Sequence, residues 1–311
     1  MLVPEKISMV IYHKDCPDGF GAAFGVWLLR GEKAQYHPAI HGNIPPDVIG
    51  QHVLIADFSY PAEILTEMIR KASSLLVIDH HITAQKELAA ISDQYKIFDM
   101  MHSGAYLVWR YLYPAGDVPL FIKYIEDRDL WSKKLPYNEE FSAGLAQYPF
   151  NFEVWKTLLT DFSQNTEALL HLKLRKTEPI NRGFIVLAAD RSNMNNLLRN
   201  AACRDVSINN KVYHVALLNS QLYRSDLGNQ LLSQFPQADF SCVYTYSDAE
   251  NSTHVSLRSE NSRADVSEIA KLYGGGGHRN ASGMTFKYIG NIIQLLTYSP
   301  SLPCPVSVHQ N

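Results

Sequence analysis

The sequence predicts an α/β protein with an N-terminal doubly wound parallel sheet and a smaller C-terminal α/β domain that contains a mixed sheet. The chain has 311 residues, which is enough for two domains of ordinary size. In its first half, short and almost wholly apolar runs alternate with segments of helical period, as expected of buried parallel strands joined by helices. In its second half, short runs of alternating apolar and polar residues indicate a mixed sheet instead.

The elements of the first half follow from these patterns. Buried strands are expected at 7–12, 52–59 and 74–81, a short strand at 34–39, and helices at 19–31, 61–72, 103–113 and 119–131. The aromatic residues Tyr12, Trp109, Trp131 and Trp155 are expected in the core, because aromatic side chains dominate protein interiors.

The second half begins after a polar, helical stretch from about Phe162 to Arg191. Strands are expected at 211–220, 240–247, 253–260 and 284–288, and Asp265 is expected to cap a helix that precedes four glycines. We place a first domain at 1–160, a helical linker at 161–195, a second domain at 196–290 and a peripheral tail at 291–311. The tail ends in a Pro- and Ser-rich stretch.

Charge and cysteine content narrow the functional class. Lys and Arg number 28 against 31 Asp and Glu, whereas chains that grip long DNA or RNA usually carry a basic excess. The sequence shows no signal-peptide pattern and no apolar run near the ~20 residues that span a bilayer. The four cysteines form no CxxC pair, which fits neither a zinc ribbon nor a disulfide framework. We therefore expect a cytoplasmic protein with no membrane association, and any nucleic-acid substrate should be short rather than a long duplex.

Acidic and imidazole side chains follow three of the predicted strands, at the point where each strand ends. They are His13 and Asp15, then Asp57, then Asp79, His80 and His81. A single aspartate at a strand end is often only a helix N-cap, but parallel strands bring their carboxyl ends to one edge of the sheet. Carboxylates and imidazoles suit Mn²⁺ or Mg²⁺, and a pair of such ions activates water for attack on phosphorus. The pattern therefore predicts metal-assisted hydrolysis of a phosphate ester or anhydride. Cys16, beside Pro17 and without a thiol partner, is interpreted as a packing residue.

The glycine-rich stretch "GGGGHRNASG" at 274–283 does not match a phosphate-binding P-loop, because it follows a helix and precedes a strand. Four glycines exceed what a helix end requires, and their backbone N–H groups can approach a phosphate or a base closely. We therefore favour a binding role over a simple turn. Arg258 and Arg263 are further candidate phosphate ligands.

Five motifs in order resemble the DHH/DHHA1 phosphoesterase family. They are "HKDCPDG", "IADFS", "VIDHH", "IEDRDLW" and "GGGGHRNASG", and they extend from residue 13 to residue 283. The similarity is greatest to nanoRNase-like phosphodiesterases, which act on short oligoribonucleotides and on linear dinucleotides such as pGpG. The resemblance implies a DHH domain at 1–160 and a substrate-binding DHHA1 domain at 196–290.

The resemblance also implies two Mn²⁺ ions, with Mg²⁺ or Co²⁺ as substitutes, and a role for individual residues. The implied metal ligands are His13, Asp15, Asp18, Asp57, His80 and Asp127. One extra residue between Asp15 and Asp18 leaves open whether His13, Asp15 or both reach the first metal, and Asp127 is favoured over Asp129. The implied catalytic residues are Asp57, which bridges the ions, His81, which contacts the scissile phosphate, and Asp79, which orients an imidazole. The implied substrate-binding residues are His81, Arg258, Gly275, Gly276, Gly277, His278, Arg279, Asn280 and Ser282.

The expected function is that of a Mn²⁺-dependent phosphodiesterase. It would hydrolyse linear dinucleotides or short oligoribonucleotides such as pGpG to 5′-mononucleotides by two-metal water activation. A phosphatase, a pyrophosphatase or a cyclic dinucleotide phosphodiesterase of the same superfamily is the alternative within enzymes. A nucleotide-binding regulatory protein without activity is the alternative of another class, disfavoured because every acidic and imidazole position is filled. Homodimers are common in the family.

Overall fold

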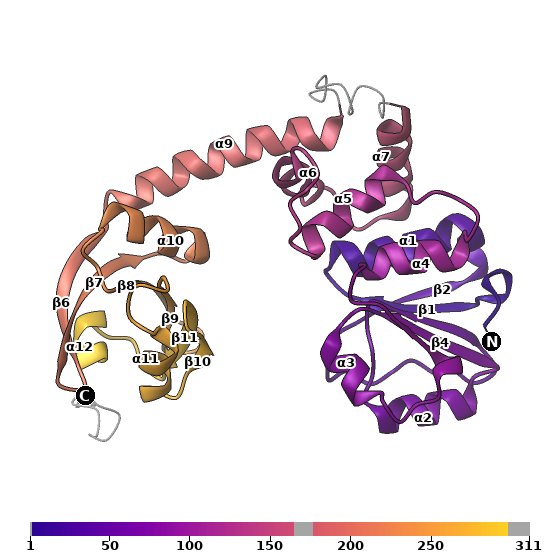
Figure 1. Ribbon diagram of the computed structural model, residues 1–311, viewed down its shortest axis with the longest axis horizontal. Coiled ribbons are helices and arrows are strands. Elements are labelled where there is room, and N and C mark those ends of the chain that lie inside the picture. Colours follow the sequence, from indigo (N-terminus) through magenta and orange to yellow (C-terminus); the bar gives the residue numbers. More distant parts are fainter. Residues whose placement is uncertain (1, 165–176, 298–311) are drawn as a thin grey trace. The chain divides into compact units, whose positions relative to one another are not determined.

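The computed structural model describes residues 2–164 and 177–297. The chain divides into two compact units, Met1–Ala188 and Ala189–Asn311, and the division falls inside the long helix α9 (Glu178–Leu198). Figure 1 shows that each unit has its own sheet and its own helices. Part of the expected linker, 165–176, and the Pro- and Ser-rich tail from 298 lie outside the described residues.

The first unit is built on an all-parallel sheet of five strands in the order β2-β1-β3-β4-β5, as the sequence predicted. The strands are β1 (Met9–His13), β2 (Gln35–Ala39), β3 (His52–Ala56), β4 (Ser74–Asp79) and β5 (Lys96–Phe98). The chain moves outward from β1 to β2 and then returns to β3 on the other side of β1. This reversal between β1 and β3 is a topological switch point, where sheets of this type bind their ligands.

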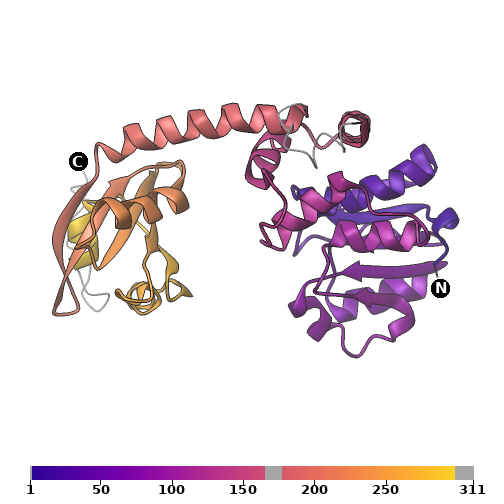
Figure 2. The ribbon, with the colours of Figure 1, turned by 45° about the horizontal axis from the view of Figure 1, so that its top comes forward.

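Helices cover both faces of this sheet, as Figure 1 and the turned view of Figure 2 show. The helices α1 (Pro17–Arg30) and α4 (Gly104–Leu112) lie on one face, and α2 (Ala62–Lys71) and α3 (Ile82–Glu87) lie on the other. The helices α5 (Leu120–Asp129), α6 (Asn138–Leu145) and α7 (Phe152–Gln164) extend the layer of α1 and α4. The sheet therefore separates two hydrophobic clusters, one around Phe24, Phe121 and Trp155 and one around Ile55 and Leu65.

Three of the four aromatic residues expected in the core pack there. Trp155 and Trp109 are buried, and Tyr12 is partly buried against the same cluster. The prediction for Trp131 was wrong, because this side chain is 61% exposed. Helix α5 ends at Asp129, and Trp131 adopts a left-handed backbone conformation beyond it, with the Arg128 guanidinium 4.0 Å from its ring centroid.

The second unit contains a mixed sheet of six strands in the order β10-β11-β9-β8-β7-β6. The strands are β6 (Ala202–Ile208), β7 (Lys211–Asn219), β8 (Phe240–Ser247), β9 (Ser252–Arg258), β10 (Gly276–His278) and β11 (Ala281–Phe286). The parallel pair β7 and β8 is joined through helix α10 (Arg224–Gln234), whereas the remaining neighbours are antiparallel. This unit matches the predicted mixed sheet.

The two faces of the second sheet carry separate hydrophobic clusters. Helix α10 and the end of α9 cover one face, while α11 (Val266–Leu272) and α12 (Ile292–Thr297) cover the other. Asp265 caps α11 as predicted, because its carboxylate accepts a hydrogen bond from the Ser267 N–H at 2.9 Å. The tail predicted from residue 291 is not peripheral at its start, since Ile292, Leu295 and Leu296 are buried in this cluster.

Among the residues that the structure describes, no helix combines the length and the apolar character needed to cross a membrane.

Candidate metal centre

The carboxyl ends of β1, β3 and β4 deliver acidic and imidazole side chains to one edge of the first sheet. Three overlapping groups could each hold a cation, and within each group the ligand atoms lie within 4.8 Å of one another. The groups are His13, Cys16 and Asp57; Asp18, His80 and Asp129; and Asp57, Asp79, His80 and His81. The cluster therefore forms at the switch point between β1 and β3 and extends to β4.

Asp57 is shared between two of these groups and is only 2% exposed. It directly follows β3 in a left-handed conformation (φ 52°), while its N–H donates to the Ile78 carbonyl at 2.9 Å. Its Oδ2 lies 3.6 Å from His13 Nδ1, and its Oδ1 lies 3.2 Å from His80 Nε2. The two oxygens of one carboxylate thus face two separate sets of donor atoms, as a carboxylate that bridges two cations must.

His80 Nε2 is surrounded by three carboxylates. It lies 3.2 Å from Asp57 Oδ1, 3.4 Å from Asp129 Oδ2 and 3.8 Å from Asp18 Oδ2. Although His80 Nε2 and Asp57 Oδ1 are close, neither buried atom has a partner in hydrogen-bond geometry among the described residues. Buried polar atoms are rarely left without a partner, so this arrangement fits a divalent cation held by carboxylate oxygens and an imidazole nitrogen.

Asp18 is fixed by the first turn of α4. Its Oδ2 accepts a hydrogen bond from the Gly104 N–H at 2.6 Å and its Oδ1 accepts one from the Ala105 N–H at 3.0 Å. A Cβ at position 104 would lie 2.5 Å from the Asp57 Cβ and 2.9 Å from Asp18 Oδ2. Only glycine therefore lets the start of α4 approach both carboxylates.

Asp79 anchors the two histidines that follow it. Its buried Oδ1 accepts hydrogen bonds from the His80 N–H at 2.7 Å, the His81 N–H at 3.2 Å and His81 Nδ1 at 2.7 Å. The His81 side chain remains 48% exposed. The bond to Asp79 raises the pKa of His81 above its ordinary value, so this accessible imidazole retains a proton more readily than a free one.

The pKa values reflect the crowding of acids. Burial, reinforced by the neighbouring Asp57 and Asp129 carboxylates, raises the pKa of Asp18, and burial also raises that of Asp129. Burial opposes protonation of His80, but the carboxylates of Asp57, Asp18 and Asp129 outweigh it and raise the pKa of His80 to about 9. For Asp57 burial is outweighed by the His13 and His80 imidazoles, which lower its pKa. The buried carboxylates therefore repel one another, and a divalent cation bound among them would neutralise this negative charge.

The structure brings together most of the predicted first-unit residues, namely His13, Asp18, Asp57, Asp79, His80 and His81. Asp15 is not among them, because its left-handed backbone (φ 55°) turns its side chain outward, where it is 75% exposed and pairs with Lys14 at 3.7 Å. The third possible metal ligand beside His13 and Asp57 is Cys16, which the sequence analysis interprets as a packing residue.

Of the two acids at the end of α5, the structure brings Asp129 rather than Asp127 to the cluster. The Asp127 carboxylate accepts hydrogen bonds from the Lys134 N–H at 2.8 Å and the Leu135 N–H at 3.3 Å, and so holds the turn after α5. Residues two apart on a helix point in roughly opposite directions, so only one of the two acids can face the cluster. That residue is Asp129.

In the second unit, strand pairing aligns two of the predicted substrate-binding residues. Ala281 of β11 pairs with Arg258 of β9 on one side and with His278 of β10 on the other. Directly opposed residues of antiparallel strands share a face of the sheet, so Arg258 and His278 flank the small Ala281 on one face. Ser225 Oγ and Ser256 Oγ accept hydrogen bonds from the Arg258 guanidinium, which holds this cation in place.

Other predicted binding residues have contacts within the protein. The Arg279 guanidinium donates to the carbonyls of Asn261 and Arg263, and the Arg263 guanidinium donates to those of Ala238 and Leu232. Asn280 Nδ2 donates to Asn261 Oδ1, and Ser282 Oγ donates to the His278 carbonyl. The contacts of Arg279, Asn280 and Ser282 hold the hairpin of β10 and β11.

The four-glycine run contributes an edge strand rather than an open loop. Gly277 has a φ of 138°, and a Cβ there would lie 2.6 Å from the Ala281 carbonyl oxygen. A Cβ at Gly275 would lie 2.3 Å from the Gly283 carbonyl oxygen, whereas one at Gly276 would meet nothing within 4 Å. Gly275 and Gly277 are therefore explained by the fold, while Gly276 leaves open space beside the backbone.

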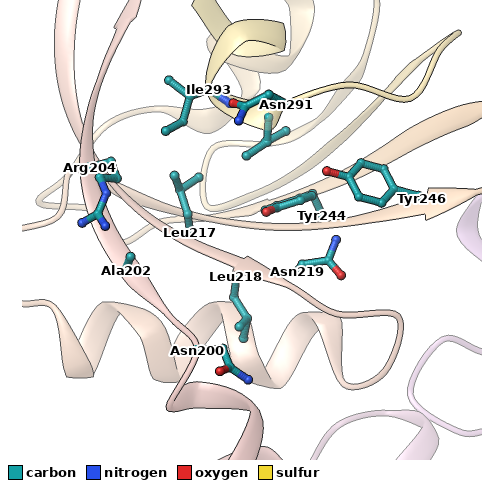
Figure 3. Close-up of a pocket in the computed structure, with 11 residues that line it drawn as sticks. Asn200, Ala202, Arg204, Leu217, Leu218, Asn219, Tyr244, Tyr246, Asn291 and Ile293 are labelled. Atoms are coloured by element: carbon teal, nitrogen blue, oxygen red, sulfur yellow. The ribbon is translucent and has the colours of Figure 1, made fainter.

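A cavity of about 430 Å³ lies elsewhere in the second unit, beside β6, β7, β8 and the start of α12. Figure 3 shows Asn200, Asn219, Tyr244 and Asn291 around it, with Arg204 on β6. No carboxylate or imidazole lines it, so it does not offer a metal site of the kind found in the first unit.

Comparisons with known proteins bear on the identity of the chain. No protein-family model matches it. The uncharacterised protein R106 of Acanthamoeba polyphaga mimivirus is 36% identical over 301 residues, which cover 92% of this chain and 69% of R106. Oligoribonuclease NrnB of Bacillus subtilis (strain 168) is 42% identical over 69 residues, which cover 22% of this chain and only 16% of NrnB.

Among solved structures, the pGpG-specific phosphodiesterase PggH from Vibrio cholerae has the same fold. Its TM-score is 0.51 at 15% sequence identity, over 90% of this chain and 93% of PggH. The parallel sheet followed by a mixed sheet is therefore a fold that this chain shares with PggH. The chain therefore belongs to the same family as R106, and it has the fold of the phosphodiesterase PggH.

Proposed function

We propose that the protein is a phosphodiesterase that uses two divalent metal ions, with Mn²⁺ preferred, to hydrolyse linear dinucleotides or short oligoribonucleotides such as pGpG to 5′-mononucleotides. The observation that carries the proposal is the placement of the Asp57 carboxylate. Its two oxygens face His13 on one side and His80 on the other. Two cations a few ångströms apart are the arrangement with which two-metal phosphatases and nucleases stabilise the attacking and leaving oxygens.

The residues around Asp57 provide two sets of ligands. His13 and Asp57 belong to one set, and Asp18, His80 and Asp129 form the core of the other. When bound, the metal pair supplies an activated water and neutralises negative charge on the phosphoryl group. The hydrogen bond that the Gly104 N–H donates to the Asp18 carboxylate keeps this carboxylate in position before any ion arrives.

His81 is suited to act on the phosphate itself. Its Nδ1 is committed to Asp79, which fixes the ring and favours the protonated form. The half-exposed ring can therefore donate from its other nitrogen to a phosphoryl oxygen. Such a donor is most effective when negative charge grows on that oxygen in the transition state.

Three observations support a short nucleotide as substrate. The chain has a net charge of −3, which does not favour a long polyanion. Arg258 and His278 share one face of the second sheet and are proposed to hold a nucleotide phosphate. Both NrnB and PggH are named for the hydrolysis of short nucleotide diesters.

A substrate panel with Mn²⁺ tests this choice. The panel contains pGpG, short RNAs, a cyclic dinucleotide, 3′-phosphoadenosine 5′-phosphate and pyrophosphate, and products are separated by chromatography. We expect 5′-GMP from pGpG and mononucleotides from short RNAs. Rapid turnover of pyrophosphate or of the 3′-phosphate, with pGpG left intact, would overturn the proposal.

A further inference from the structure

We propose that Cys16 is a thiolate ligand of one of the two metal ions and takes the position that the first motif of the sequence offers to Asp15. The inference rests on the metal site of the proposed function and adds a ligand of different chemistry to it. It predicts a metal preference that carboxylates and imidazoles alone would not give.

In the loop between β1 and α1, the side chain of Asp15 lies in solvent, whereas that of Cys16 lies beside His13 and Asp57. Asp15 has a left-handed backbone and a side chain that is 75% exposed beside Lys14. Cys16 returns to an extended conformation (φ −121°, ψ 127°) as the N-cap residue of α1. Its Sγ lies within 4.8 Å of a nitrogen of His13 and an oxygen of Asp57. The sulfur of Cys16, rather than an oxygen of Asp15, therefore lies beside His13 and Asp57.

The Asp57 carboxylate connects this group to the rest of the site. It is 2% exposed, and its Oδ1, which has no hydrogen-bond partner among the described residues, lies 3.2 Å from His80 Nε2. Its Oδ2 lies 3.6 Å from His13 Nδ1, and His13, Asp57 and Cys16 form one group of possible metal ligands. Without Cys16 that group would offer one imidazole and one shared carboxylate, which are few donors for a divalent cation. The thiolate completes a set of three.

The chemistry of binding is a simple exchange. When a cation binds, a sulfur–metal bond forms and the thiol proton is released to solvent, with no change of oxidation state. A thiolate is a softer donor than a carboxylate, and it favours Co²⁺, Zn²⁺ or Cd²⁺ relative to Mg²⁺ and Mn²⁺.

A Co²⁺ titration of the full chain tests the inference without relying on activity. Binding is followed by calorimetry and by absorption, because a cobalt–thiolate bond produces an intense charge-transfer band in the near ultraviolet. We expect the band in the wild type, its loss in Cys16→Ser, and its retention in the matched control Cys203→Ser, whose partly buried thiol lies in the second unit. Loss of this ligand should weaken Co²⁺ binding roughly tenfold or more, because losing even a residue that only orients a metal ligand costs about that much.

A second variant keeps the test decisive if serine disturbs the site. Cys16→Asp replaces the sulfur by a carboxylate and should retain tight Mn²⁺ binding, measured by electron paramagnetic resonance of the free ion, while the cobalt–thiolate band disappears. Co²⁺ bound to the wild type without the band overturns the inference but leaves the proposed function intact. A band that depends on Cys16, in a protein that does not cleave pGpG, upholds the inference and contradicts the proposed substrate. Failure of Co²⁺ and Mn²⁺ to bind the wild type contradicts both.

Discussion

Asp127 and Asp129, two residues apart on α5, make different contacts. Asp129 faces His80 at 3.4 Å, whereas Asp127 holds the backbone N–H groups of Lys134 and Leu135. The sequence motif contains both acids and offers no pattern that separates them. Their assignment depends on where the helix ends and how the following turn is closed, which only the three-dimensional structure reveals.

Paired substitutions separate the two tasks. Asp129→Asn should weaken Mn²⁺ binding on the order of tenfold or more, because it removes an anionic ligand, and should change the stability of the metal-free protein little. Asp127→Asn should instead lower the free energy of unfolding by about 1–3 kcal/mol, because it weakens two backbone contacts, with Mn²⁺ affinity preserved. Mn²⁺ titrations and urea unfolding curves measure the two effects. If Asp127→Asn weakened Mn²⁺ binding and Asp129→Asn lowered only the stability, Asp127 would be the ligand instead.

The raised pKa of His80 makes metal binding dependent on pH. In the metal-free protein His80 has a pKa of about 9, above its ordinary 6.5, so it is protonated at neutral pH. Protonated His80 contributes to the stability of the metal-free fold, and this contribution is fully present below pH 6.5. It is lost as the pH rises through about 9. A cation must displace this proton. Metal affinity should therefore increase with pH up to about 9, as calorimetric titrations in buffers of different ionisation enthalpy can measure, and affinity that is independent of pH would contradict the assignment.

At the scale of elements, the first turn of α4 is the part of the scaffold on which the site depends most closely. Gly104 brings two backbone N–H groups onto Asp18 and leaves no room for a side chain. This contact could not be predicted from sequence patterns, because Asp18 and Gly104 are far apart along the chain. Helix α4 itself was predicted from its period, but not the position of its first residue.

Gly104→Ala should displace this turn. The added Cβ would overlap Asp57 and Asp18, so we expect a loss of about 1–3 kcal/mol in stability together with weaker metal binding. Gly25→Ala in α1 is the matched control, because its Cβ would make only ordinary contacts of 3.5 Å with Leu112 and Trp109. Thermal unfolding and Mn²⁺ titration of both variants test this, and equal behaviour would show that the close approach at Gly104 is unimportant.

The glycine run of the second unit allows a similar comparison. Gly277→Ala should destabilise the hairpin of β10 and β11, since its positive φ and its neighbours disfavour a side chain. Gly276→Ala meets nothing within 4 Å and should leave the melting temperature unchanged. If a nucleotide approaches this backbone, Gly276→Ala should nevertheless raise KM for pGpG severalfold. An unchanged KM would remove Gly276 from the substrate site.

Sequence patterns predicted the buried central strands but missed several exposed edge strands. The central strands β1, β3 and β4 are nearly continuous apolar runs, and all three were expected. The edge strands β5, β6 and β10 were not, because β5 has three residues, β6 is polar and partly exposed, and β10 contains two glycines. An edge strand is fixed by pairing with its neighbour rather than by its own composition.

At the scale of the whole molecule, topology explains why the acidic and imidazole residues named from the sequence lie close together. Once β1, β3 and β4 are recognised as parallel neighbours, the residues after each strand must meet at one edge. Side-chain direction within a loop is not determined in this way, and Asp15 and Cys16 show the consequence. The same limit applies to the second unit, where strand register rather than composition places Arg258 and His278 on one face.

The central claim is that the cluster around Asp57 hydrolyses short nucleotide diesters with two metal ions. Its most direct test is the release of 5′-GMP from pGpG in the presence of Mn²⁺, by the wild type and by Asp57→Asn. Asparagine keeps the shape of the side chain but loses the charge shared between the two ligand sets, so we predict a loss of activity of at least about a hundredfold with an unchanged circular dichroism spectrum. Retention of full activity by a folded Asp57→Asn protein would contradict the account.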